Sequence, residues 1–168
     1  MDFNEYCTAI DDSHPMTTWR EHIRKVANAA TSCNTILELG SHQGFSTAAM
    51  ALAAPLARVV SVDLCDTVPE ADRVAYWASI GIKNIHPIAT TACDYLRSSP
   101  KFGMVFHDAA HGNAVMHEYL RCLEIADIVA IHDFEQLSFG NRDLIVGMSA
   151  SHEITADHKG RELFVGWV

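Results

Sequence analysis

The chain has 168 residues and a mass of 18.5 kDa, which is enough for one domain with a single substantial core. Apolar residues make up 49% and charged residues 20%, a balance that excludes a disordered chain and a charged fibrous protein. The formal net charge is −9 and the basic residues form no run, so a nucleic acid is not expected as a partner.

The sequence carries no membrane-spanning or export pattern. Its longest apolar stretch covers residues 48–57, which is too short to cross a bilayer and contains Pro55. The opening MDFNEY carries acids instead of the basic and then apolar pattern of a signal peptide, so we expect a cytoplasmic protein. The cysteines include no close pair, which disfavours a disulfide framework and a Cys-x-x-Cys zinc knuckle.

The predicted elements alternate between amphipathic stretches and short β-rich runs. Residues 1–15 predict no regular element, and we treat them as a loose N-terminal segment of a single domain covering residues 1–168. Helical periodicity predicts helices over residues 17–30, 45–54, 69–80, 91–98, 113–126 and 139–148. Strands are predicted over residues 35–39, 58–64, 84–89, 102–106 and 127–131, with a terminal hairpin formed by 153–156 and 163–168. The helix over 69–80 is expected to bury Val74, Trp77 and Ile80.

Strands separated by helices imply crossover connections between parallel neighbours. We therefore predict a doubly wound, Rossmann-like α/β fold, with a mostly parallel seven-stranded sheet and a C-terminal antiparallel hairpin. Ligands of such sheets bind beyond the carboxyl ends of the strands. Polar clusters follow four predicted strands at that end: residues 40–44, Asp63, residues 107–111 and residues 132–133.

The first strand-to-helix turn has the composition of a nucleotide-binding turn. Residues 36–46 read ILELGSHQGFS, in which Gly40 permits a close backbone approach and Gly44 permits tight packing of the next helix. The start of that helix offers unpaired amides. A nicotinamide fingerprint fails here, because His42 and Phe45 occupy positions where it requires glycine.

The acid at the end of the second strand extends this pattern. Asp63 follows the glycine turn by about twenty residues, where a carboxylate can accept hydrogen bonds from both ribose hydroxyls of a nucleoside. With Glu38 before the turn, the pattern resembles motif I of the class I S-adenosylmethionine (SAM)-dependent methyltransferases. Thr91 stands where that family often has an acid that contacts adenine. The resemblance implies a cofactor site formed by Glu38, Gly40, Ser41, His42, Gly44, Ser46, Asp63 and Thr91.

Two later strand ends resemble one branch of the same superfamily, the metal-dependent sugar and macrolide O-methyltransferases. FHDAAHG, residues 106–112, contains an Asp-x-x-His motif formed by Asp108 and His111. The branch also has a pair of acidic residues after the fifth strand. In IHDF, residues 131–134, Asp133 matches the second acid of that pair, and His132 replaces the first. The resemblance implies that Asp108 and Asp133 bind a metal.

The residue types support this chemistry. Carboxylates from adjacent strands can hold Mg²⁺ or another divalent cation, which would lower the pKa of an acceptor hydroxyl. His111 or His132 could accept the proton as general base, with Asp108 as the third catalytic residue. Without a metal, the same acids would position SAM or the acceptor.

We therefore predict SAM-dependent methyl transfer to an oxygen, rather than a nitrogen, of a small molecule. Almost no insertion follows the fifth strand, which leaves three outcomes: a site open to a larger partner, a pocket completed in a homo-oligomer, or a fold without catalysis. One alternative function is a SAM- or nucleoside-binding module without methyl transfer. Another is a small metallohydrolase whose ligands would be His107, Asp108, His111, His132 and Asp133.

Overall fold

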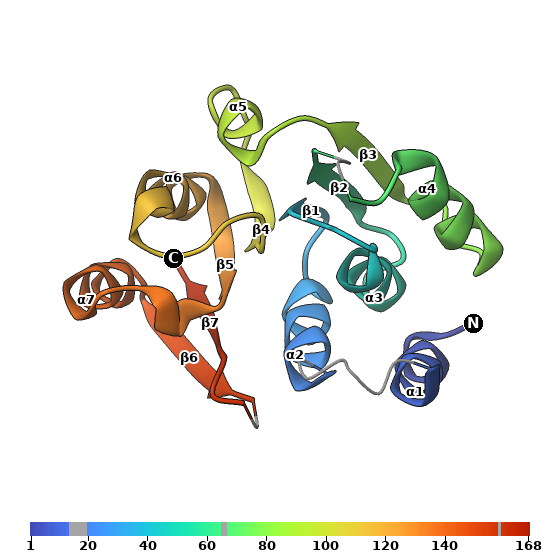
Figure 1. Cartoon of the computed structure of the whole chain (residues 1–168), viewed down its shortest axis with the longest axis horizontal. Coiled ribbons are helices and arrows are strands. Elements are labelled where there is room, and N and C mark those ends of the chain that lie inside the picture. The colour runs from blue at the N-terminus through green and yellow to red at the C-terminus, as the bar shows by residue number, and fades with distance from the viewer. Residues whose placement is uncertain (14–19, 65–66, 158) are drawn as a thin grey trace.

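A seven-stranded sheet forms the centre of the protein, in the strand order β3-β2-β1-β4-β5-β7-β6 (Figure 1). The computed structural model describes residues 1–13, 20–64, 67–157 and 159–168. The strands are β1 (Thr35–Leu39), β2 (Arg58–Asp63), β3 (Ile85–Ala89), β4 (Phe102–His107), β5 (Ala126–His132), β6 (Ser151–Ala156) and β7 (Glu162–Trp167). The strands β1 to β5 run parallel, and β7 pairs antiparallel with both β5 and β6. This confirms the predicted fold class.

Helices cover both faces of the sheet and form two cores. The helices are α1 (Phe3–Ser13), α2 (Arg20–Ala30), α3 (Phe45–Ala53), α4 (Glu70–Ser79), α5 (Ala92–Leu96), α6 (Met116–Ile125) and α7 (Phe139–Gly147). One core joins α1, α2, α3 and Trp77 of α4 to the sheet, and the other joins α5, α6 and α7. Successive residues of a strand face opposite sides, so Ile36 lies in the first core and Leu37 in the second. No helix among the described residues is long and apolar enough to cross a membrane.

The N-terminal segment corrects the sequence analysis, because residues 3–13 form the helix α1 instead of a loose end. Its start is a reciprocal cap, in which the Asp2 amide donates to Glu5 Oε2 at 2.8 Å and the Glu5 amide donates to Asp2 Oδ1 at 2.9 Å. Tyr6 is buried, and its hydroxyl donates to the Phe45 carbonyl at 3.0 Å. Docking on α3 therefore stabilises a helix whose sequence signal is weak. The predicted start of the next helix, at residues 17–19, lies outside the described residues.

Candidate functional site

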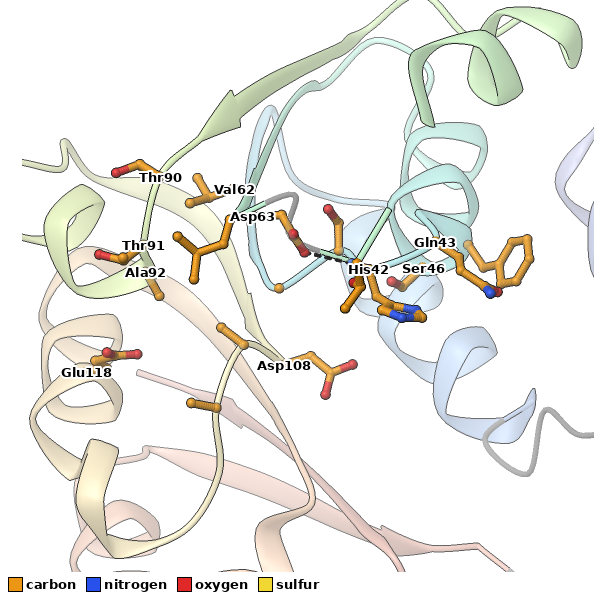
Figure 2. Close-up of a pocket in the computed structure, with 17 residues that line it drawn as sticks. His42, Gln43, Ser46, Val62, Asp63, Thr90, Thr91, Ala92, Asp108 and Glu118 are labelled. Carbon is orange, nitrogen blue, oxygen red and sulfur yellow. Dashed lines mark hydrogen bonds between the residues drawn. The ribbon is translucent and has the colours of Figure 1, made fainter. Parts of the chain in front are cut away.

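A cavity of about 690 Å³ lies at the carboxyl ends of β1, β2 and β4 (Figure 2). Of the residues predicted to bind the cofactor, Gly40, Ser41, His42, Ser46, Asp63 and Thr91 line it. Asp108 and Glu118 contribute carboxylates to the same lining. The strand ends that sequence reasoning selected therefore meet in one place, as the edge of a parallel sheet requires.

The glycine turn between β1 and α3 packs too closely for larger residues. Gly40 has a φ of +86°, and a Cβ atom there would lie 2.4 Å from the Ala109 Cα. Gly44 has a φ of +81°, and its Cβ would lie 2.7 Å from Trp77 Nε1. That indole nitrogen donates a hydrogen bond to the Gly44 carbonyl at 3.0 Å. Both glycines are therefore required by backbone conformation and by space.

Glu38 supports the glycine turn from a buried position on β1. Its side chain is completely buried on β1 and accepts hydrogen bonds from the Ser46 and Thr47 hydroxyls in the first turn of α3. Burial raises the pKa of this carboxyl to about 8, against the opposing effect of the two hydrogen bonds. Neither Glu38 nor Gly44 is part of the cavity lining. Both residues position the turn without facing the cavity.

Asp63 is held at the end of β2 by two groups. Its Oδ2 atom accepts a hydrogen bond from the His42 amide at 2.8 Å and lies 3.4 Å from Arg73 Nη1. Arg73 is only 1% exposed, and it also donates to the Ser41 hydroxyl. The sequence analysis missed Arg73, because it expected Val74 on the buried face of that helix, whereas Val74 is 42% exposed. The buried arginine fixes both the acid and the glycine turn.

Thr91 lies at the opposite end of the cavity and also begins α5. Its hydroxyl accepts a hydrogen bond from the Asp94 amide at 3.0 Å, the usual contact of an N-cap residue. The same hydroxyl donates to Asp94 Oδ2 at 2.9 Å. Thr91 is therefore placed beside the cavity by its role as a helix cap.

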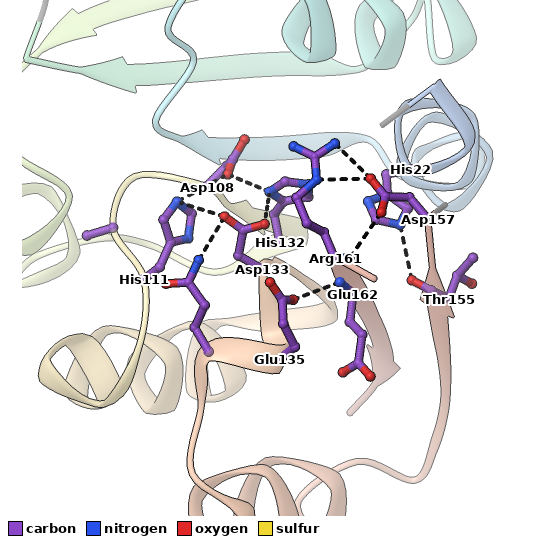
Figure 3. Close-up of polar contacts among 12 residues, drawn as sticks. His22, Asp108, His111, His132, Asp133, Glu135, Thr155, Asp157, Arg161 and Glu162 are labelled. Carbon is purple, nitrogen blue, oxygen red and sulfur yellow. Dashed lines mark hydrogen bonds and ion pairs between the residues drawn. The ribbon is translucent and has the colours of Figure 1, made fainter. Parts of the chain in front are cut away.

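A second group of side chains adjoins the cavity through Asp108. We call Asp108, His111, His132 and Asp133 the acceptor-side cluster (Figure 3). His132 Nδ1 lies 3.1 Å from Asp108 Oδ1 and 3.3 Å from Asp133 Oδ1. His111 Nε2 lies 3.8 Å from Asp108 Oδ1 and 3.6 Å from Asp133 Oδ2. The structure thus brings together all the residues that the sequence predicted for catalysis and metal binding.

The charge of His132 is set by its neighbours. Burial alone would lower the pKa of this imidazole, but the hydrogen bond to Asp108 and the charges of Asp108 and Asp133 outweigh burial and raise it. His132 therefore accepts a proton readily between two carboxylates. Two carboxylates and two imidazoles are also a donor set suited to a divalent cation, so the cluster fits the predicted metal by its chemistry.

His22 supports the acceptor-side cluster from α2, a role that the sequence did not reveal. It is buried, its Nε2 atom donates to the Thr155 carbonyl at 3.1 Å, and its ring centroid lies 5.3 Å from that of His132. Burial lowers the pKa of His22, and the nearby His132 charge lowers it further. His22, whose pKa is lowered, therefore packs against His132, whose pKa is raised.

His107 points away from the acceptor-side cluster. It is fully buried at the end of β4, and its Nε2 atom lies 2.7 Å from Glu118 Oε2 on α6. The metallohydrolase alternative counted His107 among its metal ligands. This part of the prediction is wrong, because His107 pairs with Glu118 and not with the other proposed ligands. The alternation of a strand explains the difference, because His107 and Asp108 are consecutive residues and face opposite sides.

Comparison with known proteins identifies the family of the chain. The profile of a family described as "Methyltransferase domain" matches residues 37–134, which is more than half of the chain. The chain belongs to this methyltransferase family. Together with the fold, that membership makes it a class I SAM-dependent methyltransferase, as the resemblance of its strand ends predicted.

Solved structures, among them an O-methyltransferase, share the fold at low sequence identity. The O-methyltransferase TomG from Streptomyces achromogenes, solved with SAM, has a TM-score of 0.67 and 16% identity over 99% of this chain and 88% of its own. Cofactor-bound Rv0187 from MTB has a TM-score of 0.63 and 20% identity over 88% and 78%. The N-terminal domain of EvdMO1, solved in the presence of SAH and D-fucose, has a TM-score of 0.72 and 11% identity over 88% and 82%. A search of curated proteins found no match.

Proposed function

We propose that this methyltransferase transfers the methyl group of SAM to a hydroxyl oxygen of a small molecule. The observation that carries the proposal is the position of Asp108, which lines the cavity and also lies 3.1 Å from His132. A cofactor in the cavity and a candidate base are therefore adjacent. Methyl transfer needs this proximity, because the acceptor oxygen must lie in line with the sulfonium methyl group.

The cavity lining suits the three parts of SAM. Asp63 is placed to accept hydrogen bonds from the ribose hydroxyls, and Thr91 borders the end assigned to adenine. The turn from Gly40 to His42 borders the end assigned to the methionine part. Its backbone approaches the ligand closely because the glycine has no side chain.

The chemical step uses the acceptor-side cluster. The imidazole of His132 takes the proton of the acceptor hydroxyl, and Asp108 and Asp133 stabilise the imidazolium that results. The acceptor oxygen then forms a bond to the methyl carbon while the carbon–sulfur bond breaks. The bonding electron pair returns to sulfur, which leaves as neutral S-adenosylhomocysteine (SAH). His111 is a second candidate base, because its Nε2 atom faces the same carboxylates.

Asp108 and Asp133 are the residues that would hold Mg²⁺ or another divalent cation, which leaves the imidazoles free to act as bases. Such an ion would act as a Lewis acid that makes the acceptor hydroxyl more acidic. The structural neighbour solved in the presence of SAH and D-fucose supports a sugar hydroxyl as the first acceptor to test.

A transfer assay tests the proposal. Purified protein is incubated with methyl-labelled SAM and a panel of sugars, phenols and amines, with Mg²⁺ or Mn²⁺ added or removed by chelation. We expect label in a hydroxyl compound, and we expect Asp63→Ala to lose transfer through weaker cofactor binding. Transfer to amines alone would overturn the oxygen assignment. SAM binding without transfer to any acceptor would favour a binding module.

A further inference from the structure

A second group of metal-ligating side chains lies on the helices that border the far end of the cavity. Cys93 is on α5, and His117 and Glu118 are on α6. One ligand atom from each of these residues lies within 4.8 Å of the other two. The Cys93 Sγ atom is 3.7 Å from His117 Nε2, which is 3.9 Å from Glu118 Oε1. We propose that Cys93, His117 and Glu118 form a zinc site.

Two of the three distances between the ligand atoms are close to those of tetrahedral coordination, and the third is below 4.8 Å. Zinc binds sulfur at about 2.3 Å and nitrogen or oxygen at about 2.0–2.2 Å, so its ligand atoms lie roughly 3.4–3.6 Å apart. The distances of 3.7 and 3.9 Å exceed those values by a few tenths of an ångström. The separation of 3.9 Å is also too long for a hydrogen bond between His117 and Glu118. Small side-chain movements would therefore complete the site.

The ligand types select zinc over the ions expected at the acceptor-side cluster. A thiolate, an imidazole and a carboxylate are a borderline-soft set that suits Zn²⁺, whereas Mg²⁺ prefers oxygen ligands alone. Three protein ligands leave a fourth position for water. The site is thus distinct in chemistry from Asp108 and Asp133.

The carboxylate already has the outer support that zinc ligands commonly have. Glu118 is buried, and its Oε2 atom pairs with His107 Nε2 at 2.7 Å, while its Oε1 atom is the one nearer His117. His107 is itself completely buried between the sheet and α6. Such partners orient a ligating group and keep it in one rotamer.

A bound ion would join α5 to α6. Thr91 and Ala92, at the start of α5, line the cavity together with Glu118, and Figure 2 shows these residues at the same end of the cavity. Zinc would therefore hold in place the end of the cavity that the proposed function assigns to adenine. The site itself does not depend on that function, because all three ligands are present without cofactor.

Cobalt spectroscopy of the full chain tests the zinc site without cofactor or acceptor. Co²⁺ bound to a thiolate gives an intense charge-transfer band in the near ultraviolet, which the sulfur-free acceptor-side cluster cannot produce. We expect this band to appear at one equivalent of Co²⁺ and to be displaced by Zn²⁺. Cys93→Ser should abolish the band, whereas Cys33→Ser, which changes a distant half-buried thiol, should retain it.

The histidine ligand gives a second, independent comparison. His117→Gln should lower zinc affinity more than about tenfold, whereas the same change at exposed His86 should leave it unchanged. Zinc should also raise the Tm of the wild-type chain by more than that of Cys93→Ser. Circular dichroism shows whether each variant is folded. A thiolate band that persists in Cys93→Ser, or zinc affinity equal in the wild type and in His117→Gln, would overturn the proposal.

Discussion

The Arg73 guanidinium lies 3.4 Å from the Asp63 carboxylate, although Arg73 is almost completely buried on α4. A buried charge of this kind persists only where its partner and its hydrogen bonds compensate the loss of hydration. Here the same guanidinium also donates to Ser41 in the glycine turn. The pair therefore connects the two segments that the proposed function assigns to the cofactor, and it fixes the orientation of the acid.

Removing the arginine should destabilise the protein. Arg73→Gln leaves Asp63 without its buried partner, and breaking such a pair costs about 3–5 kcal/mol. Thermal or urea unfolding measures the loss, and calorimetry should show weaker binding of both SAM and SAH. The matched control is Arg97→Gln, since Arg97 is 73% exposed and pairs with Asp94 on the surface. Equal stability of the two variants would contradict a structural role for Arg73.

The glycine turn predicts that two glycine-to-alanine variants lose different amounts of stability. Gly44 and Gly81 have nearly the same φ, +81° and +84°, but a Cβ atom meets Trp77 only at Gly44 and nothing within 4 Å at Gly81. Gly81→Ala should therefore cost about 1–2 kcal/mol from backbone strain alone. Gly44→Ala should cost clearly more, measured by urea unfolding, because the indole must also move. Equal losses would show that the turn has room for a side chain.

The buried carboxyl of Glu38 predicts how stability depends on pH. Its pKa is raised from an ordinary 4.5 to about 8, so between these values the folded chain holds a proton that the unfolded chain has released. Stability should therefore fall as the pH rises through this range, by up to about 1.4 kcal/mol per pH unit. Glu38→Gln should flatten the dependence, measured by urea unfolding at a series of pH values. A wild-type curve matched by Glu38→Gln would contradict burial of this acid.

Several features of the fold and site follow from local sequence, and others depend on distant partners. The strand Thr35–Leu39 was predicted with its observed bounds, because a β-rich run ends at a glycine that the turn requires. The meeting of polar strand ends was also predictable, because parallel strands share one edge. The burial of Arg73 was not, because its partner Asp63 lies ten positions away on another element.

The exposed aromatic residues show the same dependence on tertiary context. Phe139 begins a predicted helix but is 84% exposed at the start of α7. Trp167 belongs to a predicted strand, lies at the end of β7 and is 38% exposed. Periodicity identifies an apolar residue, but it does not show whether another element covers it.

Pro87 is accommodated in β3 because that strand is at the edge of the sheet.

The acceptor-side cluster predicts which substitution lowers the rate of methyl transfer without weakening SAM binding. His132→Gln should lower kcat by about 10²–10⁴-fold, because the imidazole that the mechanism assigns as the base is removed. SAM affinity should change little, because His132 is not part of the cavity lining. His152→Gln, at an exposed position on β6, is the control. A kcat that is unchanged in His132→Gln would remove this residue from the proposed mechanism.

The pH profile of transfer gives a separate test of His132. The base must be neutral to accept a proton, and the carboxylates raise its pKa above the ordinary value of 6.5. The acidic limb of kcat/KM should therefore have its midpoint above pH 6.5, and activity should rise as the pH increases through it. Asp133→Asn removes one of the charges and should move that midpoint to lower pH. A midpoint that does not move would show that His132 is not the titrating base.

The central claim is that the glycine turn and the neighbouring strand ends bind the adenosyl cofactor. A crystal structure of the protein with SAH tests it most directly. We expect SAH in the cavity, with its ribose hydroxyls within hydrogen-bond distance of the Asp63 carboxylate and its sulfur on the side nearest Asp108. A structure in which SAH occupies another surface, or leaves Asp63 without contact, would contradict it.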